Sequence, residues 1–378
     1  MKLYKKALLP LEFGASALAC GLKKSGKLDL ALFHSNIAAK ACGMFTANKI
    51  KAAPVKVCQN YLKKNRDFRA IIANSGNANC FTGKPGLADS YSTSEAVAKV
   101  LKVKNDSVLV ASTGIIGKRL PSAKIKSAIP SLIANLSADG MHSAAVAIMT
   151  TDIFSKEVTV KFSLGTKQVT VCGIAKGAGM IAPDMATMLS FIFTDANISY
   201  GALSKVLKEC VEGSLNCITV DGCMSTNDTV IIMANGAAAN KLIDFGNGLA
   251  LFKKALNMVC TELAKMIVRD GEGATKFIKI KVGKARSYGE AKDAALAVAN
   301  SNLFKTAVYG ENPNFGRIAA AIGASKAEVY EEKLKVKVSS LKKHDVDVEI
   351  NLNTGKAEAI VYTSDLTPEY IKINAEYN

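Results

Sequence analysis

The hydrophobic positions of the chain follow two different periodicities, which indicates a mixture of strands and helices. Short, almost wholly apolar runs are typical of buried strands, whereas apolar residues three and four positions apart are typical of helices that cover a sheet. The N-terminal part of the chain contains both patterns. Strands are predicted at 29–34, 68–73 and 107–111, and helices at 55–64, 87–101 and 121–136, the last with a break near Pro130.

The pattern changes near residue 157. Residues 157–163 and 168–171 alternate between apolar and polar around Gly165-Thr166, which predicts a β-hairpin. Further elements are predicted as strands at 187–194 and 229–234, helices at 203–211 and 248–268, and a mostly stranded tail at 328–339, 345–352 and 357–362. Mixed strands and helices with few long loops indicate an α/β fold.

The composition is typical of a folded protein of a reducing compartment. The 378 residues are 49% hydrophobic and 21% charged, which excludes a disordered chain and a coiled coil. No apolar run reaches the length of about 18 residues that a membrane helix needs, and Pro10 and Glu12 interrupt the basic N-terminus where a signal peptide would be apolar. The nine cysteines form no CxxC pair, and the three histidines have no zinc-site spacing. We therefore expect reduced thiols, a cytoplasmic location, no membrane contact and no metal site.

The positive charge lies almost entirely in the first half of the chain. Residues 1–186 have a net charge of +16 and residues 187–378 a net charge of +1. Such an excess can bind nucleic acid, steer small anionic substrates toward a basic cleft, or form a solvated, lysine-rich surface. The dispersed basic residues, the aromatic content of 6% and the absence of Trp argue against nucleic acid.

The segment 176–189, Lys-Gly-Ala-Gly-Met-Ile-Ala-Pro-Asp-Met-Ala-Thr-Met-Leu, is unusual for a protein core. It is not a phosphate-binding P-loop, because it leads into a strand and not into a helix after Gly-Lys-Ser/Thr. It forms instead a loop that delivers Thr187 to a strand whose Leu189, Phe191 and Phe193 share a face with it. Such a threonine is usually structural, but one that becomes N-terminal by chain cleavage can use its own amino group as a base and act as a nucleophile.

Other motifs accompany this segment in a fixed order. They are Phe45-Thr46-Ala47-Asn48, Ala52-Ala53-Pro54-Val55, Asn74-Ser75-Gly76-Asn77-Ala78-Asn79, Ser112-Thr113-Gly114-Ile115-Ile116-Gly117, Met149-Thr150-Thr151-Asp152, Thr226-Asn227-Asp228-Thr229, Asp270-Gly271-Glu272-Gly273-Ala274-Thr275-Lys276, Gly310-Glu311-Asn312-Pro313-Asn314-Phe315-Gly316-Arg317 and Ile373-Asn374-Ala375. Together with segment 176–189 they resemble, almost end to end, the ornithine acetyltransferases, the bifunctional glutamate N-acetyltransferases of arginine biosynthesis.

The resemblance implies that the chain cuts itself between Ala186 and Thr187. The Thr187 hydroxyl would attack the preceding carbonyl, and hydrolysis of the resulting ester would free a new N-terminus. Thr187 would then be the nucleophile, with its own α-amino group as the base. The fragments 1–186 and 187–378 would be intertwined in one α/β fold with the active site where they meet, and two copies of each would form a heterotetramer.

The same resemblance assigns roles to residues elsewhere in the chain. Thr113 and Gly114 match the oxyanion hole. Hydrogen-bond donors that point at the negative charge developing in the transition state often make the largest contribution to catalysis. The substrate contacts match Thr150, Lys176, Thr187, Glu272 and Asn374. Thr151 is the alternative to Thr150. We prefer Thr150 because of its spacing to Lys176. By charge, Lys176 would hold the α-carboxylate of the substrate and Glu272 the side-chain ammonium of ornithine.

The implied reaction is the transfer of an acetyl group from N2-acetylornithine to glutamate by a ping-pong mechanism through acetyl-Thr187. It needs no metal and no bound cofactor, and it leaves open whether acetyl-CoA is also a donor. Three alternatives remain. A self-cleaving amidohydrolase or aminopeptidase of the same architecture would pass the acyl group to water, a binding protein would keep the 186–187 bond intact, and a nucleic-acid-binding protein would be retained on a polyanion in a salt-dependent way.

Overall fold

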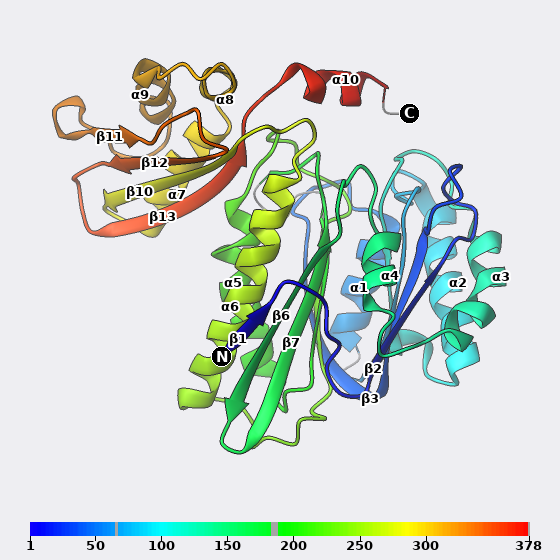
Figure 1. The fold of residues 1–378 in the computed structure, drawn as a ribbon. Helices are drawn as coiled ribbons and strands as arrows, with labels where there is room; N and C mark the ends of the chain where they lie inside the picture. Colours follow the sequence, from blue (N-terminus) through cyan, green and yellow to red (C-terminus); the bar gives the residue numbers. More distant parts are fainter. Residues whose placement is uncertain (65–66, 183–187, 377–378) are drawn as a thin grey trace. The chain divides into compact units, whose positions relative to one another are not determined.

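The computed structural model describes residues 1–64, 67–182 and 188–376, and its mixed α/β architecture is the one that the sequence predicts (Figure 1). The chain divides into two units, and each unit consists of three separate segments of the sequence. The first unit comprises Met1–Gly177, Asp184–Leu215 and Met224–Leu263, and the second comprises Ala178–Pro183, Asn216–Cys223 and Ala264–Asn378.

A nine-stranded mixed sheet forms the centre of the first unit (Figure 1). Its strands are β1 (Lys2–Tyr4), β2 (Phe13–Leu18), β3 (Leu30–Phe45), β4 (Phe68–Asn74), β5 (Val108–Ser112), β6 (Lys156–Leu164), β7 (Lys167–Lys176), β8 (Leu189–Thr194) and β9 (Thr229–Ala234). Their order is β1-β6-β7-β8-β9-β3-β4-β5, with β2 paired to β3. The β4–β5 and β8–β9 pairs are parallel, which places the ends of β4 and β5 at one edge of the sheet.

The long strand β3 joins the two halves of this sheet. Leu30 to His34 pair with β4, and Lys40 to Phe45 pair with β9. The sequence predicts only the first half of this strand, because the polar residues Ser35 and Asn36 end the apolar run. The register with β4 shifts between His34 and Ala39, so the strand continues past a local irregularity that the apolar pattern cannot anticipate.

The helices of the described part of this unit are α1 (Ala53–Lys64), α2 (Gly83–Leu101), α3 (Ser122–Ala134), α4 (Met141–Ala147), α5 (Tyr200–Glu212) and α6 (Gly246–Arg269). Residues of α6 up to Leu263 belong to the first unit. α1 and α2 contact β5, α3 and α4 contact β2, and α5 contacts β3. The long helix α6 lies on β7, where a Cβ atom at Gly173 would come within 2.6 Å of Val259.

The predicted break near Pro130 is wrong, because α3 runs through this residue without interruption. A proline inside a helix loses one backbone hydrogen bond and crowds the preceding turn. Ile125, Ile129 and Leu132 are buried on both sides of it, and their packing on the core outweighs that cost.

The predicted hairpin and the predicted face of β8 are confirmed for the residues that the structure describes. β6 and β7 pair from Lys156 to Leu164, and Gly165 turns the chain with a φ of 61°. Leu189, Phe191 and Phe193 belong to one core cluster, where Phe33 packs against both phenylalanines at ring-centroid distances of 5.2 Å. Thr187, predicted to share this face, lies outside the described residues.

The second unit is built on a four-stranded sheet in the order β11-β12-β10-β13 (Figure 1). Its elements are β10 (Phe277–Ala285), α7 (Tyr288–Ala299), α8 (Asn302–Tyr309), α9 (Phe315–Gly323), β11 (Lys335–Val338), β12 (Asp345–Asn351), β13 (Ala357–Ser364) and α10 (Pro368–Glu376). The stranded tail is thus confirmed at β11, β12 and β13. It is wrong for residues 328–334, which contain a 3-10 turn at Glu331–Lys333. The helix α10 follows the predicted tail and was not predicted.

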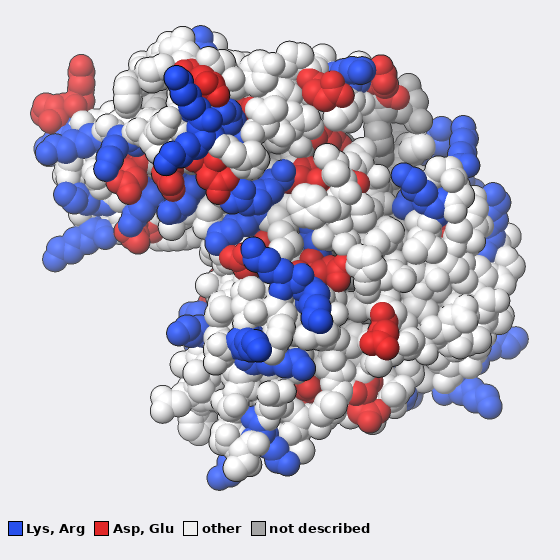
Figure 2. All heavy atoms as spheres, in the orientation of Figure 1, with Lys and Arg blue, Asp and Glu red and all other residues white. Residues whose placement is uncertain are grey.

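The basic side chains on the face drawn in Figure 2 do not form one stripe. Figure 2 shows lysine and arginine side chains spread over the face drawn, with acidic side chains among them. Among the described residues, Lys156, Lys176 and Lys305 are the buried lysines. None of the nine cysteines, all of which the structure describes, forms a disulfide, and seven of them are buried. Within the described part of the chain, no helix combines the length and apolarity needed to cross a bilayer.

Candidate active site

The loop that follows β5 carries the two residues assigned to the oxyanion hole. Thr113 is buried, and its backbone N–H donates to the carbonyl of Asn74 at 3.0 Å. Gly114 has a φ of +130°, a backbone conformation that side-chain-bearing residues rarely adopt. A Cβ atom at this position would lie 2.4 Å from the carbonyl carbon of Gly76. The close approach of the two loops therefore requires glycine at position 114.

Lys176, at the end of β7, brings two of the predicted residues together. Its side chain is buried, and its ammonium group donates to Thr150 Oγ1 at 2.6 Å and to Thr113 Oγ1 at 3.4 Å. The structure thus gathers the loop after β5, the segment after α4 and the end of β7 around one positive charge. A buried ammonium group between two hydroxyls is suited to binding a carboxylate.

Asp152 holds this arrangement together, although the sequence analysis gave it no role. Its carboxylate accepts from Lys156 Nζ at 2.6 Å, from the Gly177 N–H at 2.7 Å and from the Thr150 N–H at 2.9 Å, and it lies 3.9 Å from Lys176 Nζ. Burial alone would raise the pKa of the Asp152 carboxyl. The ammonium groups of Lys176 and Lys156 outweigh burial and hold that pKa well below its usual range. Asp152 therefore stays ionised and fixes the backbone N–H groups of Thr150 and Gly177 in place.

The predicted nucleophile Thr187 and its neighbour Ala186 lie outside the described residues. The first described residue after them is Met188, whose N–H donates to Asp228 Oδ1 at 3.0 Å. Asp228 is fully buried, and its Oδ2 atom has no hydrogen-bond partner among the described residues. Burial raises the pKa of the Asp228 carboxyl well above its usual value. The motif Thr226-Asn227-Asp228-Thr229 marked this residue without indicating its contact with the chain beside Thr187.

The two remaining predicted residues lie together in the second unit. The Asn374 side chain, on α10, donates to Glu272 Oε2 at 2.8 Å and to the Tyr370 carbonyl at 3.0 Å. The Glu272 N–H donates to the carbonyl of Ala178 at 2.9 Å. A Cβ atom at Gly179 would come within 2.5 Å of both Glu272 carboxylate oxygens, so a glycine at 179 leaves room for the Glu272 carboxylate.

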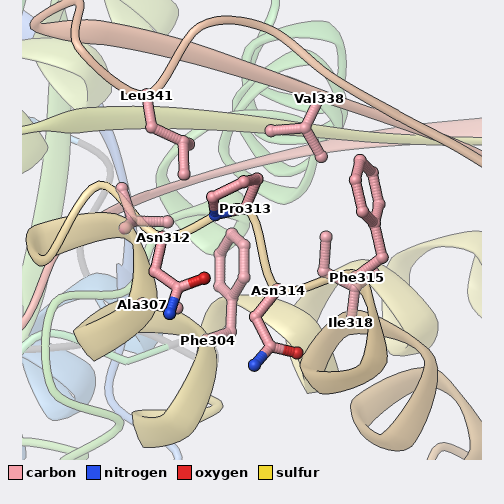
Figure 3. A pocket seen from close by; sticks show the side chains of 10 residues that line it. Phe304, Ala307, Asn312, Pro313, Asn314, Phe315, Ile318, Val338 and Leu341 are labelled. Atoms are coloured by element: carbon pink, nitrogen blue, oxygen red, sulfur yellow. The ribbon is translucent and has the colours of Figure 1, made fainter.

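The motif Gly310–Arg317 has a structural position in the second unit. It connects α8 to α9, and the Asn314 side chain accepts from the Arg317 N–H as the helix cap. Figure 3 shows Pro313 and Phe304 facing Leu341 across a small pocket. The described side chains that line it are apolar or carry amides. No cluster of three or more potential metal ligands occurs among the described residues.

Comparison with known proteins identifies the family. The model of the ArgJ family matches residues 14–378. The chain belongs to the ArgJ family. It is 43% identical over 397 residues to the arginine biosynthesis bifunctional protein ArgJ of Caldanaerobacter subterraneus, with 98% of each chain covered. It is also 44% identical over 386 residues to the glutamate N-acetyltransferase of Methanocaldococcus jannaschii, covering 94% of this chain and 95% of that protein.

Among solved structures, ornithine acetyltransferase from Mycobacterium tuberculosis, crystallised with ornithine, is similar to half of this chain. The match covers 99% of that chain at 39% identity and a TM-score of 0.45. Membership of the ArgJ family makes the protein an acyltransferase of arginine biosynthesis. The family resemblance inferred from the sequence motifs is thereby confirmed.

Proposed function

We propose that the protein transfers an acetyl group from N2-acetyl-L-ornithine to L-glutamate by a ping-pong mechanism. The observation that carries this proposal is the near-full-length similarity to a protein named glutamate N-acetyltransferase. The buried Lys176–Thr150–Thr113 cluster supports it, because it provides a cation and hydroxyl groups for a small anionic substrate. A ping-pong route divides the transfer into two acyl steps, so donor and acceptor need not bind together.

The first step of the proposal is self-cleavage between Ala186 and Thr187. The Thr187 hydroxyl attacks the Ala186 carbonyl, the C–N bond breaks, and an ester replaces the peptide bond. Water then hydrolyses the ester, leaving the Ala186 carboxylate and a free Thr187 amino group. The fragments 1–186 and 187–378 stay associated in this proposal, and two copies of each form a heterotetramer.

In the transfer steps, the Thr187 amino group takes the hydroxyl proton as Oγ1 attacks the acetyl carbonyl. The C–N bond of acetylornithine breaks, and the proton leaves with the amino group of ornithine. Glutamate then attacks the acetyl ester through its own amino group and restores the Thr187 hydroxyl. The Thr113 N–H already donates to the carbonyl of Asn74. Thr113 would therefore stabilise the oxyanion through its side-chain hydroxyl, and Gly114 through its N–H.

Charge complementarity assigns the substrate contacts. Lys176 would hold the α-carboxylate, with Thr150 beside it, and Glu272 would hold the side-chain ammonium of ornithine, with Asn374 fixing its carboxylate. None of these steps needs a metal or a bound cofactor, and acetyl-CoA is a second donor in this proposal. The nine cysteines, none of which forms a disulfide, fit a reducing compartment, and we place the enzyme in the cytoplasm.

The intact mass of the purified, denatured protein tests the proposal. Cleavage predicts two masses, each about half of 39.9 kDa, which sum to the mass of the chain plus one water, with the second fragment beginning at Thr187. The Thr187→Ala variant is the control and should give one uncut mass and no transfer. A single mass for the wild-type protein, or normal transfer by the variant, would contradict the proposal. Acetylornithine consumption that glutamate does not accelerate would favour the amidohydrolase instead.

A further inference from the structure

An open groove of the first unit lies where α1 and α2 begin. It encloses about 830 Å³, open solvent at its mouth included. Lys51, Lys56 and Lys84 line it, and no acidic residue is among its described lining residues. Part of the excess positive charge of residues 1–186 lies in this groove. The proposed acetyl transfer between amino acids assigns no role to these lysines.

The lysines are placed to receive an anion larger than an amino acid. Lys56 and Lys84 are exposed at the start of α1 and α2. Lys51 is half-buried, and its ammonium group is fixed by the backbone carbonyls of Thr46 and Asn48. Three cations attract phosphate groups strongly where, as among the described lining residues of this groove, no carboxylate competes for them. The start of α2 reinforces this attraction, since its first turn contains no acidic residue.

An exposed aromatic ring completes the groove. Phe81 is 76% exposed, although a large apolar side chain usually avoids water. Its φ of 57° is in the left-handed region, which is unfavourable for a bulky residue. A mostly exposed aromatic ring therefore lies in the lining of a basic groove. Aromatic faces in this setting stack on nucleobases.

The groove is connected directly to the loop assigned to the oxyanion hole. The Ala78 N–H donates to the carbonyl of Ile115, and the Gly117 N–H donates to the carbonyl of Cys80, which precedes Phe81. Gly114 and Gly117 are three residues apart, and three residues span at most about 11 Å. A flexible arm of one ligand can therefore extend from the groove toward that loop.

We propose that this groove binds the phosphorylated adenine nucleotide of an acyl-coenzyme A donor. The lysines would hold its phosphates, Phe81 would stack on the adenine, and the pantetheine arm would carry the thioester toward Gly114. The Thr187 hydroxyl would attack the thioester carbonyl, the C–S bond would break, and the thiol would leave with the hydroxyl proton. This inference rests on the proposed function, in which Thr187 accepts the acetyl group.

The test compares the two donors in variants of the purified protein. Lys56→Glu/Lys84→Glu reverses the charge of the groove. The matched control, Lys63→Glu/Lys99→Glu, changes the same total charge at the opposite ends of the same two helices, where both residues are exposed. The KM for acetyl-CoA should rise about tenfold or more in the groove variant and change less than about twofold in the control. The KM for acetylornithine is the internal reference and should stay within about twofold in both.

A binding measurement separates the outcomes. Calorimetric titration with coenzyme A should show binding to the wild-type protein and weaker binding to the groove variant and to Phe81→Ala. Coenzyme A binding or acetyl-CoA KM values that are equal in the groove and control variants would overturn the groove assignment. Acetyl transfer from acetylornithine without any binding of coenzyme A would also overturn it and leave the proposed function intact. No transfer from either donor by the wild-type protein would refute the proposed function itself.

Discussion

The ammonium group of Lys176 and the hydroxyl oxygen of Thr150 are 2.6 Å apart, although 26 residues separate them in the chain. Both belong to the first unit, and Asp152 accepts the N–H groups of Thr150 and of Gly177, the residue after Lys176. One carboxylate therefore fixes the backbone on both sides of this contact. A substrate carboxylate would meet a cation whose position is already set, which reduces the ordering cost of binding.

Replacing Thr150 by valine should weaken catalysis without preventing self-cleavage. Valine keeps the shape of the side chain but leaves the buried Lys176 ammonium without this acceptor. Loss of a hydrogen bond to a charged group costs about 1.5–3 kcal/mol, so kcat/KM for acetylornithine should fall about tenfold to a hundredfold. Thr151→Val is the control and should change kcat/KM less than about threefold. Steady-state kinetics and intact mass check both expectations. The opposite ranking of the two variants would assign the contact to Thr151.

Gly114→Ala should disable the oxyanion loop. The new Cβ atom would lie 2.4 Å from the Gly76 carbonyl carbon and 2.6 Å from the Asn77 nitrogen, so one of the two loops must move. Loss of an oxyanion donor typically lowers kcat about a hundredfold to a thousandfold. Gly117→Ala is the control, because it also has a positive φ but no atom within 4 Å of the new Cβ. Equal kcat values in the two variants would remove Gly114 from the oxyanion hole.

Elements whose apolar residues stand between clearly polar neighbours could be predicted from the sequence, and elements without this difference could not. β9 is correctly predicted because six apolar or β-branched residues stand between polar ones. α7 is not predicted, since its buried face consists mainly of alanines that differ little from their neighbours in hydrophobicity. α10 has no buried residue, so no amphipathic pattern marks it.

The candidate site shows a similar limit. Motifs identify Thr113, Thr150 and Lys176 as residues of interest, but they do not indicate which atoms meet. The contact between Lys176 and Thr113 joins residues 63 positions apart, and such pairing depends on the order of the strands in the sheet. Asp152 and Asp228 stand within motifs, yet their hydrogen bonds to backbone N–H groups follow only from the folded structure.

Glu272→Gln should remove the recognition of the side-chain ammonium of ornithine. The amide oxygen still accepts from Asn374 Nδ2, so the local structure is kept while the charge is lost. The KM for acetylornithine should rise about tenfold or more, since a charge-assisted contact becomes neutral. N-acetylnorvaline, which has no ammonium group, should react equally well with both proteins. Glu369→Gln, an exposed residue on the same helix α10 as Asn374, is the control. A variant that still prefers acetylornithine would exclude this role for Glu272.

Asp228 should make the folded protein less stable as the pH rises. Burial raises the pKa of its carboxyl above the unfolded value, which is about 4. The folded state therefore binds the proton more tightly, and the resulting stability is fully present below the unfolded pKa and is lost as the pH rises through the folded pKa. Each pH unit in that interval should lower the free energy of unfolding by at most about 1.4 kcal/mol.

The Asp228→Asn variant isolates this contribution. Asparagine keeps an oxygen acceptor for the Met188 N–H but has no titrating group, so it should flatten the pH dependence of the free energy of unfolding between pH 5 and pH 8. Urea unfolding at several pH values measures it, and Asp139→Asn, a substitution at an exposed residue of the first unit, should leave the wild-type slope unchanged. The neutral amide should also support self-cleavage if Asp228 acts as an uncharged acceptor beside Thr187. The wild-type free energy of unfolding could instead depend on pH no more steeply than that of Asp228→Asn. Asp228 would then be ionised in the folded protein, and its Oδ2 atom would require a cation or a donor from the chain next to Met188.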